Sequence, residues 1–238
     1  MSLNDEIRDL ANAEGAEFFG VSNLAPARAA IVDQGGSDLG QFTHAISLGI
    51  GLLHSIVDQL SVHPDAQVAE LYKYYCYDLI NDCLNKIGNR VASLLQGKSY
   101  HALSVPAAYT ADAKRLCGIF SSKMAAHLAG LGWIGKSCLL VTPEVGPRVR
   151  WATVLTNAPL TETGKAMEQR CGDCRACVEV CPAQAFTGRS FDEKEAREAR
   201  FRAEDCNSHL QKMKELLGLS VCGLCLKVCP HGVKASRN

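Results

Sequence analysis

The sequence predicts an α+β fold in two parts, with helices and strands over residues 1–165 and a small cysteine-rich domain over residues 166–238. Two observations predict this division. Apolar residues recur every three or four positions over residues 66–95, which is typical of one long amphipathic helix. Eight of the twelve cysteines fall within the last 68 residues. A chain of 238 residues, 47% of them hydrophobic, is long enough for one medium and one small domain.

Shorter elements are expected on both sides of the long helix. The pattern predicts a helix from about residue 3, strands at residues 18–21, 44–50 and 100–105, and a helix at residues 122–129. Two β-rich runs, residues 138–142 and 149–155, flank a proline–glycine turn and are expected to pair as a hairpin. Polar residues 161–170 predict a linker, and the mixed charges of residues 189–205 predict a solvated helix.

Composition excludes several classes of protein. The chain has 25 basic and 25 acidic residues, and this net charge of zero argues against a nucleic-acid partner, which a basic excess would favour. No stretch approaches the roughly 18 apolar residues of a membrane helix. The first residues are acidic and lack the apolar core of a signal peptide. We therefore expect a cytoplasmic protein with no membrane partner.

The cysteines form two groups whose spacing is specific. The first group has the pattern Cys-x2-Cys-x2-Cys-x3-Cys-Pro, and it consists of Cys171, Cys174, Cys177 and Cys181. The second group consists of Cys206, Cys222, Cys225 and Cys229, again closed by a proline. Two-residue spacers let consecutive thiolates reach neighbouring irons of one cluster. In two-cluster ferredoxins, the fourth cysteine of such a run binds the other cluster.

This pattern predicts two 4Fe-4S clusters with crossed ligation. One cluster is assigned to Cys171, Cys174, Cys177 and Cys229, and the other to Cys206, Cys222, Cys225 and Cys181. The alternative is structural zinc, because paired Cys-x2-Cys motifs also bind zinc. Zinc would need neither the third cysteine nor the trailing prolines. Clusters of this kind carry single electrons, at potentials anywhere from about −700 to +450 mV.

A second signature precedes the cysteines. It is the string Ala129-Gly130-Leu131-Gly132-Trp133-Ile134-Gly135-Lys136, followed by Leu139-Leu140, Gly146-Pro147-Arg148, Thr153-Val154-Leu155-Thr156-Asn157 and Pro159-Leu160. Joined to the two cysteine groups, it makes residues 120–231 resemble the corrinoid and iron–sulfur reductase family. That family contains epoxyqueuosine reductase and, more distantly, the reductive dehalogenases.

The resemblance implies a nitroreductase-like fold for the first part, which would hold cobalamin beside one cluster. The residues implied in cobalamin binding are Gly130, Gly132, Trp133, Gly135 and Lys136. Glycines there would let the backbone approach a large flat molecule, and the lysine would meet an anionic group. The alternative is structural: the glycines form a helix C-cap and a turn, and the tryptophan fills the core. His127 is a candidate lower ligand or proton donor, with a helix-surface histidine as the alternative.

The chain also departs from the family pattern. The queuosine enzymes carry an Asp-Ser-Ala-Pro-like segment before the glycine string, whereas this chain has Leu116-Cys117-Gly118-Ile119 there. Asp112 aligns only with a gap, so no catalytic residue is assigned. Cys117 and Cys138 flank the glycine string and are expected to be structural. The chain ends at Asn238, before the helical-repeat region with which the tRNA enzymes hold their substrate, which makes epoxyqueuosine reduction the less favoured activity.

These observations favour a cobalamin- and iron–sulfur-dependent reductase. It would pass single low-potential electrons from a ferredoxin or flavodoxin, through two 4Fe-4S clusters, to cobalamin held by the N-terminal domain, and so reduce an unidentified small-molecule substrate. The alternative is a non-enzymatic ferredoxin-type carrier, or a reductive activator of a corrinoid partner protein.

Overall fold

The computed structural model describes residues 1–236, which separate into two compact units. The first unit comprises Met1–Ile50, Ile80–Leu131 and Arg150–Met167. The second comprises Gly51–Leu79, Gly132–Val149 and the chain from Glu168 onward. The chain enters the second unit for the last time at Glu168, three residues after the boundary predicted at residue 165. The sequence did not indicate that two earlier segments, residues 51–79 and 132–149, would join the cysteine-rich part.

A four-stranded sheet forms the centre of the first unit. Its order is β1 (Phe18–Asn23), β2 (His44–Gly51), β6 (Val149–Thr156) and β3 (Ala102–Val105). The β1–β2 and β3–β6 pairs are antiparallel. Strand β6 lies inside the sheet and is buried over almost its whole length, as its run of apolar and β-branched residues requires. The strands predicted near residues 18, 44 and 100 are confirmed.

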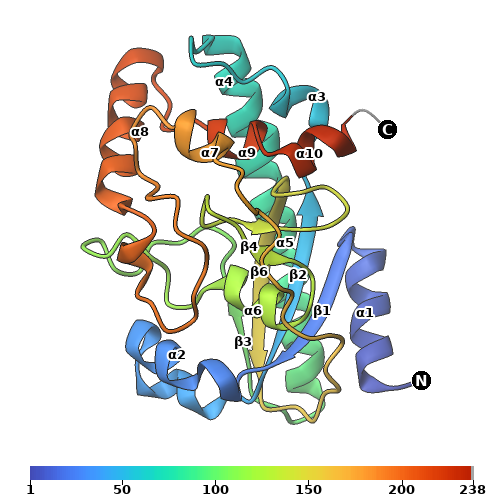
Figure 1. Ribbon diagram of the computed structural model, residues 1–238. Coiled ribbons are helices and arrows are strands. Elements are labelled where there is room, and N and C mark those ends of the chain that lie inside the picture. Colours follow the sequence, from blue (N-terminus) through green and yellow to red (C-terminus); the bar gives the residue numbers. More distant parts are fainter. Residues whose placement is uncertain (237–238) are drawn as a thin grey trace. The chain divides into compact units, whose positions relative to one another are not determined.

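Helices pack on this sheet and on one another in the first unit (Figure 1). They are α1 (Leu3–Ala13), α2 (Arg28–Gly35), α5 (Ile80–Gly97) and α6 (Ser122–Leu128), with the short 3-10 helices η1 (Ala25–Ala27) and η2 (Ser37–Gln41). Helix α1 packs against α5, α5 lies along β3, and α6 lies along β1. Ser2 caps α1 and Ser121 caps α6, each accepting a backbone N–H of the first turn.

The long helix predicted over residues 66–95 is confirmed in extent, but it is not uniform. It consists of α4 (Ala66–Lys73), the π-helical segment η3 (Tyr74–Leu79) and α5. Asp65 caps its start by accepting the amide of Val68 at 2.9 Å. A π turn inside an α-helix admits an extra residue and commonly marks a functional or strained place. Here it ends at the last residue of the second unit's segment, Leu79.

The second unit holds short elements joined by loops. They are α3 (His54–Val57), β4 (Trp133–Ile134), β5 (Leu140–Val141), α7 (Ala176–Glu179), the 3-10 helix η4 (Arg197–Ala199), α8 (Ala203–Leu217), α9 (Leu224–Lys227) and α10 (Pro230–Ala235). Over residues 1–236, no helix is both long enough and apolar enough to span a bilayer.

Two of the local predictions for residues 138–205 are wrong. Strand β5 pairs with β4 rather than with β6, because Thr142 and Gly146 close a tight turn on themselves and β6 pairs within the large sheet. The stretch at residues 189–205 is not one solvated helix. Arg200 is buried over the ring of Phe191, and Phe201 stacks on Phe186, so the chain folds back on itself until α8 begins.

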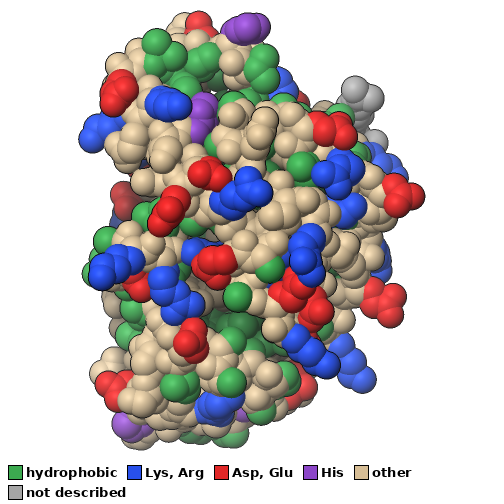
Figure 2. Space-filling model, turned by 60° about the vertical axis from the view of Figure 1, so that its left-hand side comes forward, with side chains coloured by type: hydrophobic (Ala, Val, Ile, Leu, Met, Phe, Trp, Pro, Cys, Tyr) green, Lys and Arg blue, Asp and Glu red, His purple; other side chains and the backbone are tan. Residues whose placement is uncertain are grey.

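Surface charge follows the neutral composition. Figure 2 shows acidic and basic side chains intermixed over the visible face, as expected for 25 residues of each sign.

Candidate metal centres

The eight cysteines of the second unit come together in two sets of four. Cys177, on α7, lies close enough to Cys171, Cys174 and Cys229 for their charges to raise its pKa. Cys225, on α9, has the same relation to Cys222, Cys206 and Cys181, and more weakly to Cys177 of the first set. These neighbours agree with the two sets that the sequence predicts, with the last cysteine of each run exchanged, and place the two sets near each other. The role of each cysteine as an iron ligand stays a prediction.

Burial raises the pKa of five of these thiols, which are Cys177, Cys206, Cys222, Cys225 and Cys229. Burial, followed by the neighbouring thiolates Cys171 and Cys229, raises the pKa of Cys177 to about 11. Burial and Cys181 likewise raise the pKa of Cys206 to about 11. Burial raises the pKa of Cys225 still further. A metal centre bound by these thiols would take them as thiolates, and its binding would release their protons.

Neither the cysteine sets nor any other group among the described residues forms a site for a single ion. Over residues 1–236, no three histidine, cysteine, aspartate or glutamate side chains converge as a single metal ion would require.

A buried lysine supports the loop of the first set. Lys136 is 8% exposed, and its Nζ donates to the carbonyl of Gly172 at 2.6 Å and to that of Cys174 at 3.2 Å. No acidic side chain within residues 1–236 forms an ion pair with it. The ammonium therefore satisfies carbonyls that the tight Cys-x2-Cys turn leaves without backbone partners.

Two buried N–H groups near the same set have no acceptor in the protein. Trp133, on β4, is 1% exposed, and its Nε1 has no partner. Its ring meets that of His231, two residues after Cys229, edge to face at 4.9 Å. Gln169 accepts the amide of Cys171 through Oε1 at 2.5 Å, while its Nε2 is buried without a partner. Unsatisfied buried donors are uncommon and call for an explanation such as a bound group.

The three glycines of the string are needed for packing. Gly130 follows α6 with φ +78°, the left-handed conformation that favours glycine at a helix C-terminus. A Cβ on Gly132 would lie 2.3 Å from the carbonyl oxygen of Val141, and one on Gly135 would lie 2.9 Å from its Cγ2. These contacts and the burial of Trp133 are what we expect if the glycines form a helix C-cap and a turn and the tryptophan fills the core. The cobalamin role of Gly130, Gly132, Trp133, Gly135 and Lys136 stays a prediction.

A buried arginine supports the second motif, and the sequence analysis assigned it no role. Arg148 is fully buried and donates to Asp58 at 2.7 Å, to Nδ1 of His54 at 2.9 Å and to the carbonyl of Lys227 at 3.3 Å. The hydrogen bond from Arg148 lowers the pKa of Asp58 below its usual value. Gly232 is held against the arginine so closely that a Cβ would lie 2.8 Å from Nε.

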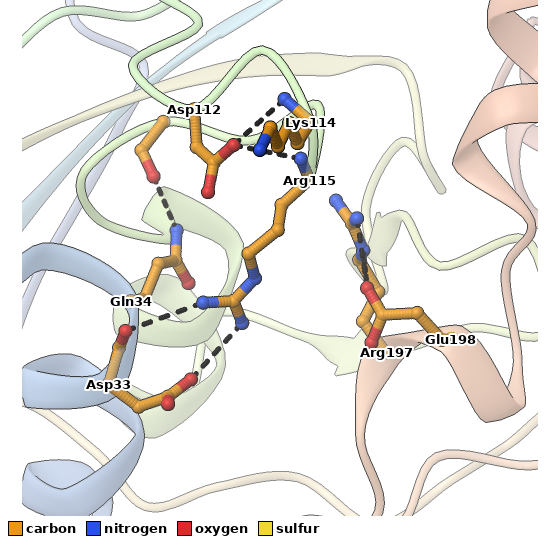
Figure 3. A network of polar contacts seen from close by, with 8 residues as sticks. Asp33, Gln34, Asp112, Lys114, Arg115, Arg197 and Glu198 are labelled. Carbon is orange, nitrogen blue, oxygen red and sulfur yellow. Dashed lines mark hydrogen bonds and ion pairs between the residues drawn. The ribbon is translucent and has the colours of Figure 1, made fainter.

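In the first unit, the loop over residues 109–118 is held by α2 (Figure 3). Arg115 donates to the side chain of Asp33 at 3.1 Å and to its carbonyl at 3.3 Å, and Gln34 donates to the carbonyl of Gly118 at 2.8 Å. Asp112 accepts the amides of Lys114 and Arg115. The backbone hydrogen bond from Arg115 lowers the pKa of Asp112, so this carboxylate stays ionised and caps a turn.

The remaining candidates lie in structural positions. His127, in the last turn of α6, is buried at 8% exposure, so the helix-surface alternative is wrong. The backbone of Cys117 pairs with Asp112, and Cys138 is buried after a turn closed onto Gly135. Neither cysteine joins the two sets of four.

Comparison with known proteins identifies the cysteine-rich part. Residues 170–232 match the family described as 4Fe-4S double cluster binding domains. The chain contains a double cluster domain. The prediction of two 4Fe-4S clusters is thereby confirmed, and the zinc alternative is set aside.

The double cluster domain and the residues before it are related to known reductases. The chain is 31% identical over 116 residues to epoxyqueuosine reductase of Bacillus cereus, a match that covers 48% of this chain and 30% of that protein. The matched region is thus less than a third of that relative, and the resemblance drawn from the glycine string and the cysteines is confirmed.

Solved structures of both enzyme types share the fold. Epoxyqueuosine reductase crystallised with an epoxyqueuosine-modified tRNA stem loop matches with a TM-score of 0.65 at 18% identity, covering 97% of this chain and 65% of that one. A reductive dehalogenase whose structure suggests a mechanism for B12-dependent dehalogenation matches at 0.66 and 18%, covering 94% and 31%. At these identities the likeness concerns the fold, which is a mixed helix and sheet fold with a double cluster domain.

Proposed function

We propose that this protein is an iron–sulfur oxidoreductase whose two clusters relay single electrons to cobalamin. The observation that carries the proposal is the double cluster domain at residues 170–232, in a chain related to reductases over about half its length. Each electron would come from a protein donor such as a ferredoxin or flavodoxin. The electron would pass on to an acceptor held by the N-terminal part of the chain. We propose that this part has a nitroreductase-like fold.

The chain's own residues fit the clusters. Cys171, Cys174, Cys177 and Cys229 would hold one cluster, and Cys206, Cys222, Cys225 and Cys181 the other. Bound clusters supply one-electron chemistry that no side chain offers. Sulfur atoms of a cluster at the first set would also give the buried N–H groups of Trp133 and Gln169 acceptors.

Cobalamin rests on similarity alone. One structure with a similar fold is that of a reductive dehalogenase and suggests a mechanism for B12-dependent dehalogenation. Bound cobalamin would supply the two-electron reduction of substrate that clusters do not perform. The side chains of Trp133 and Lys136 point to a different use, because both are buried against the first cysteine motif. A corrin site formed by the glycine string would therefore have to use backbone atoms.

Two other functions compete with this proposal. A ferredoxin-type carrier, or an activator of a corrinoid partner, would need the clusters and no cobalamin. A tRNA substrate is the third possibility, because one relative's structure holds a tRNA stem loop; the net charge of zero argues against it. We also retain a cytoplasmic location as part of the proposal.

One anaerobic titration separates these functions. Purified protein with reconstituted clusters is mixed with cobalamin, and the corrin absorbance is followed. We expect saturable spectral change at micromolar or tighter affinity, and reduction of the bound corrin when a low-potential donor is added. Clusters that reduce normally while added cobalamin gives no spectral change would leave the carrier function. A parallel titration with a tRNA stem loop, which we expect not to bind, tests the third.

A further inference from the structure

We infer that Lys136, together with the buried N–H groups of Trp133 and Gln169, forms a donor shell for the cluster of Cys171, Cys174, Cys177 and Cys229 and raises its reduction potential. The inference rests on the double cluster domain and not on cobalamin. It assigns Lys136 as a positioning residue rather than a contact to a corrin. All the residues concerned lie in the second unit.

The first argument is charge. A buried ammonium without an acidic partner is costly unless a negative group lies nearby. Lys136 is 8% exposed and donates only to the carbonyls of Gly172 and Cys174. A 4Fe-4S cluster with four thiolates carries net negative charge, and reduction adds one more. The ammonium therefore stabilises the reduced cluster more than the oxidised cluster, which makes the potential less negative.

The second argument is hydrogen bonding. Nε1 of Trp133 and Nε2 of Gln169 are buried without acceptors in the protein, and each side chain is tied to the first set. Gln169 holds the amide of Cys171, and Trp133 packs on His231 beside Cys229. Sulfide and thiolate sulfurs of a bound cluster are acceptors that would satisfy both groups. Hydrogen bonds to those sulfurs also favour the reduced form.

The second set is surrounded differently. The buried guanidinium of Arg148, which donates to the carbonyl of Lys227 two residues after Cys225, is paired with Asp58 at 2.7 Å. Lys227, between Cys225 and Cys229, is half-buried and donates to the carbonyl of Leu60. The effect of Lys136 should therefore fall on one cluster and leave the other unchanged.

Redox titration of the protein with both clusters tests the inference. Potentials are followed by electron paramagnetic resonance in Lys136→Met, Lys136→Arg and Lys212→Met, together with iron content. A Cys225→Ala variant, expected to keep only the first cluster, assigns the signals. In Lys136→Met we expect the first cluster's potential to become more negative and the second's to stay. Lys136→Arg keeps the charge, and Lys212 is an exposed lysine on α8, so both should retain wild-type potentials.

Unchanged potentials in Lys136→Met at full iron content would overturn the role of the lysine. Loss of the first cluster alone would support it, since the ammonium holds the Gly172 and Cys174 carbonyls. If Lys136→Met does not fold, Trp133→Phe decides: it replaces the indole with a smaller aromatic ring and removes the N–H, and a smaller negative shift of the same cluster is expected. An unshifted potential in that variant would overturn the donor shell. Cobalamin titration of the same variants reports separately on the proposed function.

Discussion

The two cysteine sets share a spacing but are held in different ways. In the first, Cys171 and Cys174 lie in a loop whose carbonyls accept from Lys136 and whose first amide is bound by Gln169, and Cys177 follows on the short helix α7. In the second, Cys206 lies in the first turns of α8 and Cys225 within α9, between the buried Leu224 and Leu226. Helices satisfy their own backbone groups, whereas a tight loop needs side chains to do so. The predicted ligands are thus supported mainly by polar contacts in the first set and mainly by apolar packing in the second.

The largest expected effect comes from exchanging single cysteines. Because the closing cysteine of each run belongs to the other set, Cys181→Ala should lose the second cluster and Cys229→Ala the first. Each variant should keep roughly half of the iron and sulfide, since each of the two clusters holds four irons. Metal analysis of anaerobic protein, with spectra compared to Cys177→Ala and Cys225→Ala, gives the answer. If the spectrum of Cys181→Ala matched that of Cys177→Ala, the two cysteines would belong to the same cluster, which would contradict the crossed ligation.

Removing Arg148 should come next in size. Arg148→Ala deletes hydrogen bonds to Asp58, His54 and Lys227 and leaves a void at a fully buried position. We expect a loss of about 3 kcal/mol in the free energy of unfolding. Anaerobic denaturant unfolding measures it. Arg150→Ala, which is nearby in sequence and less buried, is the control; an equal loss in both variants would remove the special role of Arg148.

A smaller effect with a pH signature is expected at Asp58. Its side chain is 44% exposed, so Asp58→Asn should cost only about 1 kcal/mol at neutral pH. Arg148 lowers the folded-state pKa, so this contribution is complete above the unfolded pKa near 4 and is lost as pH falls through the lowered value. The free energies of unfolding of wild type and variant should therefore differ by a constant amount above about pH 5 and converge in acid. A difference that grows on acidification would show the opposite sign.

The smallest effect is expected in the first unit. The Arg115–Asp33 pair in Figure 3 is exposed, with side chains 45% and 72% accessible, so Arg115→Met should change stability by about 0.5 kcal/mol or less. The loop over residues 109–118 should nevertheless become more sensitive to proteolysis, because two contacts to α2 are lost. Limited proteolysis compared with Arg8→Met, at an exposed pair on α1, checks this. Equal cleavage patterns would mean that Gln34 alone holds the loop.

Local patterns in the sequence determined much of the fold and the metal chemistry. The periodicity of residues 66–95 gave the long helix, and short apolar runs gave β1, β2 and β3, because contacts along one element repeat with its own geometry. The spacing of the cysteines likewise predicted two sets of four, with Cys181 and Cys229 exchanged. Short spacers restrict which thiols can reach one cluster, so this information is contained in a few neighbouring residues.

Only the tertiary structure decided which distant segments meet. It paired β5 with β4, folded residues 189–205 around Arg200, and brought Arg148 to His54 and Asp58, about 90 positions away. It also placed the ammonium of Lys136 on carbonyls 36 and 38 residues along the chain. No local period encodes such contacts, because they depend on which buried polar groups need partners once the core has packed.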